Sequence, residues 1–333
     1  MAVIAADGLS KCFPVRAGLV ARLFGRARDG AISAVDDVGF SVEAGETLGI
    51  VGESGCGKST TCLMVARLLA PSAGTIRLLG VDAARIPLRD YRRQVQIIFQ
   101  DPYESLNPRM RIFDIVAEGP RALRIWPEAE IKLRTAAMID RVGLDPSRYG
   151  ESYPHELSGG ERQRVGIASA LILEPKLVIA DEPVSMLDVS IRADILDLLR
   201  GLQRASGFAC IYVSHDLSIV ANFADRLLVM YLGKTMETGR AIDVLGQPQN
   251  PYTRALVAAI PVPIPGHRRP KSVVHGDVAQ PIDPPPGCRF APRCPKAIAV
   301  CRQSAPALLP YAAGHLTACH LVVSDHASRG PSR

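Results

Sequence analysis

The residues best suited to chemistry form a glycine-rich stretch, Gly-Glu-Ser-Gly-Cys-Gly-Lys-Ser, that ends at Ser59. It fits the pattern G-x-x-x-x-G-K-[ST], in which glycines let backbone N–H groups turn toward a phosphate. Lys58 would contact the β- and γ-phosphates, and the Ser59 hydroxyl would reach Mg²⁺. An ordinary strand-to-helix turn is the alternative. The pattern predicts that ATP is bound by Gly52, Glu53, Ser54, Gly55, Cys56, Gly57, Lys58, Ser59 and Thr60.

Two adjacent carboxylates, Asp181 and Glu182, end a second apolar run. Adjacent carboxylates on a loop are usually solvated. At the end of a buried strand, in a chain with a phosphate-binding loop, they suit metal binding and water activation. Asp181 would hold Mg²⁺ through water, and Glu182 would orient the attacking water or accept its proton.

Two further side chains follow apolar runs. His215 is the only one of seven histidines that directly follows a predicted buried strand. A lone histidine is more often structural, but this position favours a hydrogen bond to the γ-phosphate or help in orienting Glu182. Gln100 ends the run Val95 to Phe99 and suits contacts to Mg²⁺ and water. The predicted catalytic residues are Lys58, Gln100, Glu182 and His215.

The stretch Leu-Ser-Gly-Gly-Glu-Arg-Gln-Arg ends at Arg164. Ser158 and Glu161 have the spacing of a capping box at the start of a helix. A glycine-flanked helix N-terminus with exposed N–H groups is also an anion site. A helix cap and a phosphate contact are compatible here.

Short apolar runs position these groups. Thr47 to Val51, Leu177 to Ala180 and Ala209 to Val213 are continuously apolar, as expected for central strands covered on both faces. Because ligands bind beyond the carboxyl ends of parallel strands, the three segments direct polar groups to one sheet edge. A helical run, Thr60 to Leu69, follows the glycine loop. The pattern predicts an α/β domain with a mainly parallel sheet.

Composition divides the chain. We predict an ATPase domain over residues 1–250, interrupted by a proline-broken helical insertion at about 101–165, and a Pro/Cys-rich C-terminal extension over 251–333. Residues 14–33 are predicted to form a basic loop. The pattern favours a solvated hairpin, with a loop near the membrane as the alternative.

Charge and hydropathy exclude some classes of function. The net charge of +6 belongs to the tail, where residues from Ile264 onward carry nine Lys or Arg and three Asp or Glu. The charge-balanced remainder argues against a nucleic-acid surface. Since the sequence has no uncharged run of about 18 apolar residues and no signal peptide, we expect a cytoplasmic protein held at a membrane by partner chains.

Four cysteines lie within 32 residues near the C-terminus: Cys288, Cys294, Cys301 and Cys319. In a reducing cytoplasm such a cluster is more often a metal site than a disulfide set. Wide spacing favours a [4Fe–4S] cluster over zinc. Arg289, Arg293 and Lys296 would offset its negative charge, and four unliganded thiols are the alternative.

The set of motifs resembles the ABC transporter ATPases. The glycine loop, Gln100, LSGGERQR, LVIADE, the loop with Asp188, and His215 occur in this order across residues 3 to 245. The segments IFQDPYESLNPRM, DEPVSMLDVSI, NPYTRALVAAIP and GCRFAPRCPKA are similar to the oligopeptide/dipeptide permease ATPases. Asn250 stands where that family usually has His. Met186 likewise replaces a usual Ala, and Glu161 a common Gln. None of these three departures touches a phosphate contact.

The resemblance implies further roles. A small antiparallel β subdomain and a helical subdomain would flank the core. Phe13 would stack on adenine, with a core Phe as the alternative reading. Two ATPase subunits would face head to tail, and Ser158, Gly159, Gly160 and Glu161 of one chain, with Asp188 in the adjacent loop, would close on the ATP of the other.

The implied partners are a paralogous ATPase subunit, two transmembrane permease subunits and an extracytoplasmic solute-binding protein. Hydrolysis would power import of oligopeptides or dipeptides at the cytoplasmic face of the bacterial inner membrane. Nickel complexes, opines, glutathione-like molecules or sugars are alternative solutes. A non-transport ABC ATPase acting on ribosomes or DNA, or a module with ATP as a structural ligand, would belong to other classes.

Overall fold

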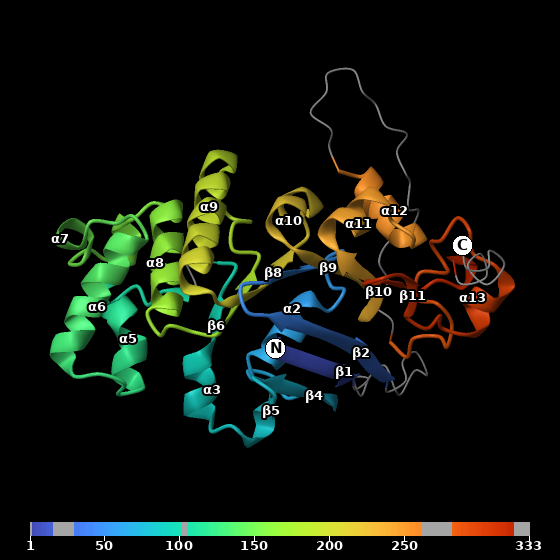
Figure 1. Cartoon of the computed structure of the whole chain (residues 1–333), viewed down its shortest axis with the longest axis horizontal. Helices are drawn as coiled ribbons and strands as arrows, with labels where there is room; N and C mark the ends of the chain where they lie inside the picture. Colours follow the sequence, from blue (N-terminus) through green and yellow to red (C-terminus); the bar gives the residue numbers. More distant parts are fainter. Residues whose placement is uncertain (1, 16–29, 102–104, 261–281, 323–333) are drawn as a thin grey trace, which may run out of the picture. The chain divides into compact units, whose positions relative to one another are not determined.

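The computed structural model describes residues 2–15, 30–101, 105–260 and 282–322 (Figure 1). Most of the predicted basic loop, residues 14–33, lies outside the described residues, as do parts of the predicted extension. The chain divides into two compact units. The first comprises Met1–Ala5, Ser41–Thr47 and Ile76–Val213, and the second comprises Ala6–Phe40, Leu48–Thr75 and Ser214–Arg333.

The first unit contains a parallel sheet with the order β6-β7-β8. Strand β6 spans Val95–Ile98, β7 spans Leu177–Asp181 and β8 spans Ala209–Ser214. Every residue of β8 is buried, as are the first four of β7, which explains their continuously apolar sequence. The structure confirms the strands predicted over Leu177 to Ala180 and over Ala209 to Val213.

Helices dominate the rest of this unit. Helices α5, α6 and α8 pack against one another, and α9 lies beside α8 (Figure 1). The helices of the first unit are α3 (Leu88–Gln94), α5 (Ile112–Ala122), α6 (Glu128–Arg141), α7 (Pro146–Tyr149), α8 (Gly159–Leu171) and α9 (Val189–Ser206), with the 3-10 helices η1 (Ala83–Arg85) and η2 (Pro154–Glu156).

The second unit contains the strand order β3-β9-β10-β12-β11. Strand β3 runs parallel to β9, and the other neighbours are antiparallel. Its strands are β3 (Thr47–Val51), β9 (Arg226–Tyr231), β10 (Lys234–Arg240), β11 (Leu309–Ala312) and β12 (His315–Thr317). Strands β11 and β12 come from the C-terminal part of the chain, and β12 continues the sheet by pairing with β10.

Helices of the second unit are short. They are α2 (Lys58–Val65), α10 (Leu217–Phe223), α11 (Ala241–Gly246), α12 (Pro251–Ala258) and α13 (Ala299–Gln303). Helix α2 is shorter than the predicted run Thr60 to Leu69. It ends because Arg67 adopts a left-handed conformation with φ of 54°, which an α-helix cannot contain.

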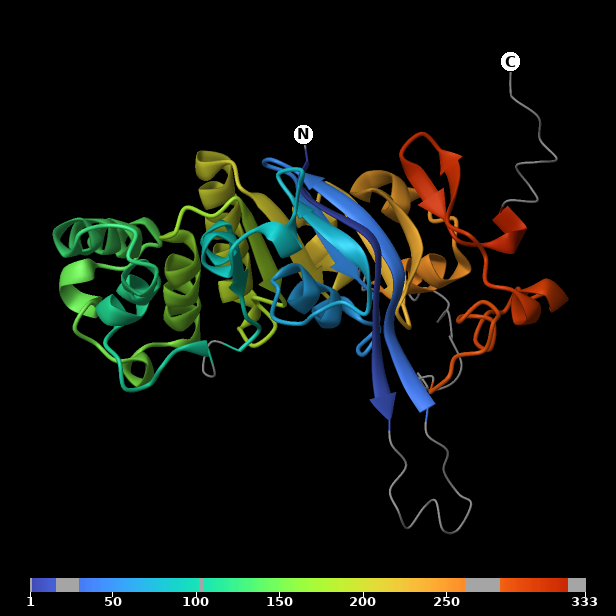
Figure 2. The same cartoon turned by 90° about the horizontal axis from the view of Figure 1, so that it is seen from below.

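A further sheet has the order β2-β1-β4-β5, in which β1 and β2 lie side by side (Figure 2). Its strands are β1 (Ala2–Val15), β2 (Gly30–Glu43), β4 (Ala73–Leu78) and β5 (Val81–Asp82). Strands β1, β2 and β4 each have residues in both units. Within the described parts of the chain, no helix combines the length and the hydropathy needed to cross a bilayer.

Candidate nucleotide site

The glycine loop joins the fully buried strand β3 to helix α2, as predicted. Gly52 has φ of 155° and Gly57 has φ of 102°, a region that favours glycine. A Cβ atom at Gly52 would overlap the carbonyl oxygen of Met230, and one at Gly57 would overlap that of Ala34. These two positions therefore require glycine both for backbone conformation and for space.

Lys58 begins helix α2 and lies within this loop with 6% of its surface exposed. Its Nζ donates to the carbonyl oxygens of Gly52 at 2.8 Å and Glu53 at 3.0 Å. Burial raises the pKa of the neighbouring Cys56 thiol, and Lys58 opposes that shift. Lys58 Nζ also lies 3.9 Å from Cys56 Sγ, and none of these three contacts is with a carboxylate. A cation held in this way beside exposed Ser54 and Ser59 can bind an anionic phosphate and its metal ion.

The predicted catalytic carboxylate lies at the end of β7, in the first unit. Glu182 has φ of 48°, and its backbone N–H donates to the carbonyl oxygen of Val213 at 3.0 Å. Gln100 follows β6 and donates from Nε2 to Oε2 of Glu182 at 3.3 Å. Ser185 donates to the carbonyl oxygen of Glu182 through both its backbone N–H and its hydroxyl. The structure thus brings Gln100 and Glu182 together.

The segment after Leu157 forms the predicted capping box at the start of α8. Ser158 Oγ accepts a hydrogen bond from the Glu161 N–H at 3.4 Å, and Glu161 Oε2 accepts one from the Ser158 N–H at 2.8 Å. Tyr149 donates to Glu161 Oε1 at 2.6 Å, and this bond, followed by those from Ser158, lowers the pKa of Glu161. A Cβ atom at Gly160 would lie 2.7 Å from Ile191 Cγ2, so glycine permits the close approach of α9.

The remaining predicted residues differ in accessibility. Phe13 is 38% exposed, which contradicts the alternative of a core Phe and leaves its ring accessible for stacking. Lys11 Nζ lies 5.3 Å from the centre of this ring. His215 follows β8 and is exposed, as is Asp188 at the start of α9. Their roles stay predictions.

The four C-terminal cysteines line one small cavity of about 20 Å³, together with Phe290 and Lys296. Burial raises the pKa values of Cys288 and Cys294. Among the residues that the structure describes, no group of three or more His, Cys, Asp or Glu side chains is arranged to hold a metal ion. The structure therefore places the four thiols on one cavity, and in the described residues they are not arranged as the ligands of a metal ion.

The prediction that Arg289 and Arg293 offset the charge of the cysteines is wrong. Arg289 instead pairs with Asp36 and donates to the carbonyl oxygen of Leu232. Arg293 pairs with Glu53 in the glycine loop. Sequence reasoning also missed Tyr252, whose hydroxyl binds Glu53. An arginine near cysteines carries no local signal for a carboxylate 240 residues earlier in the chain.

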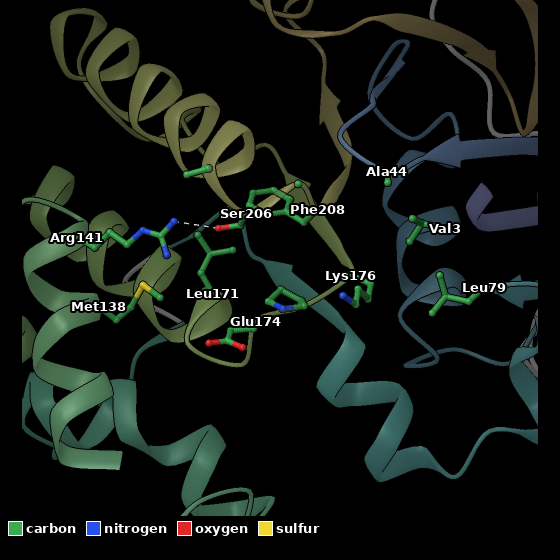
Figure 3. Close-up of a pocket in the computed structure, with 13 residues that line it drawn as sticks. Val3, Ala44, Leu79, Met138, Arg141, Leu171, Glu174, Lys176, Ser206 and Phe208 are labelled. Atoms are coloured by element: carbon green, nitrogen blue, oxygen red, sulfur yellow. Dashed lines mark hydrogen bonds between the residues drawn. The ribbon is translucent and has the colours of Figure 1, made fainter. Parts of the chain in front are cut away.

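A larger cavity of about 590 Å³ lies elsewhere in the first unit (Figure 3). Arg141 of α6 and Ser206 of α9 face each other there and are joined by a hydrogen bond of 3.0 Å. Val3, Phe208 and Leu171 contribute apolar surface. This cavity contains none of the predicted site residues and no glycine-lined phosphate cradle, so we do not assign it to nucleotide chemistry.

Family models match two parts of the chain. The ABC transporter model matches residues 35–185, and the model of the oligopeptide/dipeptide transporter C-terminal region matches residues 236–301. A probable peptide ABC transporter ATP-binding protein of Sinorhizobium fredii is 43% identical over 96% of this chain and 90% of its own length. An oligopeptide transport ATP-binding protein of Haemophilus influenzae is 46% identical over 88% of this chain and 90% of its own.

Solved structures have the same fold. An ABC transporter subunit of Clostridium perfringens, part of a larger transporter complex, has a TM-score of 0.62 and 27% identity, over 74% of this chain and 91% of its own. An ATP-binding cassette solved as a dimer with ADP and phosphate has a TM-score of 0.61 at 23% identity, over 72% of this chain and 98% of its own. Together with the loop that holds Lys58, these matches show that the chain belongs to the ATP-hydrolysing ABC transporter ATP-binding proteins with an oligopeptide/dipeptide transporter C-terminal region.

Proposed function

We propose that this protein hydrolyses ATP to power the import of peptides across the bacterial inner membrane, at whose cytoplasmic face partner subunits hold it. The observation that carries the proposal is the glycine loop around Lys58, in a chain whose C-terminal region matches that of oligopeptide/dipeptide transporters. The relatives named as peptide transport proteins match nearly the whole chain, which supports peptides over the alternative solutes.

The residues present fit ATP with Mg²⁺. Backbone N–H groups in the segment Gly52 to Thr60 would bind phosphates, apart from that of Glu53, which donates to the Tyr252 hydroxyl. Lys58 would neutralise the phosphate charge, and Phe13 would stack on adenine. Ser59, Gln100 and Asp181 offer the oxygen ligands that Mg²⁺ prefers, and the ion would offset the charge that develops on the phosphates. Glu182 would accept the proton of the attacking water, and His215 would donate to the γ-phosphate.

We further propose that the ATPase domain, residues 1–250, works as a head-to-tail pair with a paralogous subunit. Ser158, Gly159, Gly160 and Glu161 would then contact the partner's ATP, with Asp188 beside them. The cap formed by Ser158 and Glu161 fixes the first turn of α8 and supports this role, because its N–H groups have a defined direction. Two membrane permease subunits and an extracytoplasmic solute-binding protein would complete the transporter.

The extension, residues 251–333, would carry an iron–sulfur cluster on its four cysteines, with zinc as the alternative. What supports this is the donor set, four thiols on one cavity, because both centres accept four-cysteine ligation. Purification without oxygen, followed by assays for iron, acid-labile sulfide and zinc, tests it. Metal-free protein with four titratable thiols and unchanged stability would contradict the proposal.

Transport is tested with the assembled complex. The chain is co-expressed with neighbouring permease and solute-binding-protein genes, purified from membranes and reconstituted in vesicles with ATP inside. Uptake of labelled di- to penta-peptides that depends on ATP is the expected result. Copurification with ribosomes or DNA in place of permease subunits, or uptake of a nickel complex or sugar but no peptide, would overturn it.

A further inference from the structure

Glu53, the second residue of the glycine loop, forms an ion pair with the C-terminal part of the chain. Arg293 Nη1 donates to Glu53 Oε2 at 2.7 Å and to the Tyr231 hydroxyl at 3.2 Å. The side chains are 12% exposed for Arg293 and 24% exposed for Glu53. Water therefore screens this pair less than an ordinary surface ion pair.

The backbone of Glu53 is bound by a second C-terminal residue. Its N–H donates to the hydroxyl oxygen of Tyr252, on helix α12, at 3.0 Å. Tyr252 is fully buried between Tyr231 and Phe290, with ring centres 4.7 Å and 5.3 Å away. Phe290 and Tyr231 also meet edge to face at 5.2 Å. The packing of these three rings therefore fixes the Tyr252 hydroxyl oxygen, which accepts the hydrogen bond from the Glu53 N–H.

The same residue contacts the lysine that binds phosphate. Lys58 Nζ donates to the carbonyl oxygen of Glu53, so the N–H, the carboxylate and the carbonyl of Glu53 each have a partner. Any shift of Glu53 would move the loop backbone and one acceptor of Lys58 together. Without a cation beside it, the Glu53 carboxylate would also oppose a triphosphate bound in the loop, because like charges repel.

We propose that Arg293 is a positioning residue of the ATPase reaction: through Glu53 it holds the glycine loop in place and neutralises a carboxylate beside the phosphate site. Tyr231, Tyr252 and Phe290 support it by fixing the loop backbone and the Arg293 side chain. The C-terminal region thereby contributes to nucleotide affinity although it contains no nucleotide motif. The inference rests on ATP binding in the glycine loop and not on the transported solute.

The test compares charge variants of the full chain by titration with a fluorescent ATP analogue and by ATPase kinetics of the assembled transporter. Arg293→Gln leaves the Glu53 charge uncompensated, so we expect roughly tenfold weaker ATP binding and a higher KM with a smaller change in kcat. Arg293→Lys restores part of the affinity. Arg240→Gln is the matched control, because Arg240 forms an exposed ion pair with Asp243 in the same unit.

The double variant Glu53→Gln with Arg293→Gln separates electrostatics from folding. We expect it to bind ATP more tightly than Arg293→Gln alone, because the unpaired carboxylate is gone. Equal affinity of Arg293→Gln and the wild type would overturn the inference, as would a double variant that binds no better than the single one. Failure of the wild type itself to bind ATP would instead contradict the nucleotide site.

Discussion

Gln100 and Glu182 are joined by a hydrogen bond of 3.3 Å although they are 82 positions apart in the chain. They follow the neighbouring parallel strands β6 and β7, which are in register at Ile98 and Ala180. The backbone of Glu182 is fixed as well, through the carbonyl oxygen of Val213. The carboxylate therefore has a defined direction, as a group that orients a water molecule requires.

Replacing Glu182 by Gln keeps the size of the side chain and its contact with Gln100 but removes the proton acceptor. We expect ATP to bind as in the wild type while hydrolysis slows by at least about 100-fold. Phosphate release by the assembled transporter measures this. Glu130→Gln, on the exposed surface of α6, serves as control. Near-normal turnover of Glu182→Gln would remove Glu182 from the catalytic role.

Ser158→Arg places a bulky cation at the start of α8. We expect transport-coupled ATPase to be lost while the isolated subunit still binds ATP, because the affected surface would contact the partner's nucleotide. Loss of the Ser158 cap also costs about 1 kcal/mol of stability. Ser158→Ala reproduces that loss without the added bulk and is the control for it. Weaker ATP binding by the isolated Arg variant would place Ser158 in the subunit's own site.

The buried side chain of Asn250 forms hydrogen bonds with three backbone groups of the second unit. Its amide donates to the carbonyl oxygens of Met236 at 3.2 Å and Ala318 at 2.8 Å, and its Oδ1 accepts from the Tyr252 N–H at 2.9 Å. Asn250→Ala removes the side-chain partner of the Ala318 carbonyl oxygen and of the Tyr252 N–H, whereas the Met236 carbonyl oxygen keeps the Ala318 N–H at 2.8 Å. We therefore expect the free energy of unfolding to fall by about 2–4 kcal/mol.

Urea denaturation of the full chain measures the effect of Asn250→Ala. Asn222→Ala, at an exposed position of α10, is the matched control and should stay within about 0.5 kcal/mol of the wild type. A small change at Asn250, equal to that at Asn222, would show that water replaces the lost partners.

The thiols of Cys288 and Cys294 should lose their protons at higher pH than ordinary thiols in metal-free protein. Burial raises the pKa values of Cys288 and Cys294, so at a given pH a smaller fraction of each is thiolate than in an unfolded chain. Their alkylation rates should be low at pH 7 and keep rising above pH of about 9, where an ordinary thiol levels off. Mass spectrometry after timed alkylation measures the rates, with exposed Cys12 as the fast reference.

A bound metal centre would change this result. Ligation requires thiolates, so cysteines that hold a metal resist alkylation at every pH until a chelator removes it. Rapid modification of Cys288 and Cys294 at pH 7 in the metal-free protein would contradict the direction of the pKa shift.

Much of the first unit's site could be predicted because local signals determine it. The strand that precedes Asp181 is continuously apolar, and the spacing of Ser158 and Glu161 specifies a cap. Parallel strands place their carboxyl ends together, so residues that follow them become neighbours without any knowledge of the loops between. The contact of Gln100 with Glu182 is of this kind.

Other contacts could not be predicted because no periodic pattern encodes them. Arg293 contacts Glu53, 240 positions earlier in the chain, and the nearby contacts of Phe290 with Tyr231 and Tyr252 are likewise set by tertiary packing. The end of α2 after Val65 was also missed, since Arg67 adopts positive φ without being glycine. Tertiary packing determines where such a helix ends and which side chains pair, because intrinsic helix propensity is a weak preference that packing overrides.

Strand β12 pairs with β10, with Glu237 opposite Thr317, and His315 Nε2 lies 2.7 Å from the fully buried Glu237 carboxylate. A C-terminal region taken from a relative would therefore fold onto this chain only if it preserved these contacts. A donor region would have to supply the strand register, the histidine partner of Glu237 and an arginine for Glu53. Chimeras that cross over near residue 250 should consequently assemble only when both halves come from parents that share these three features.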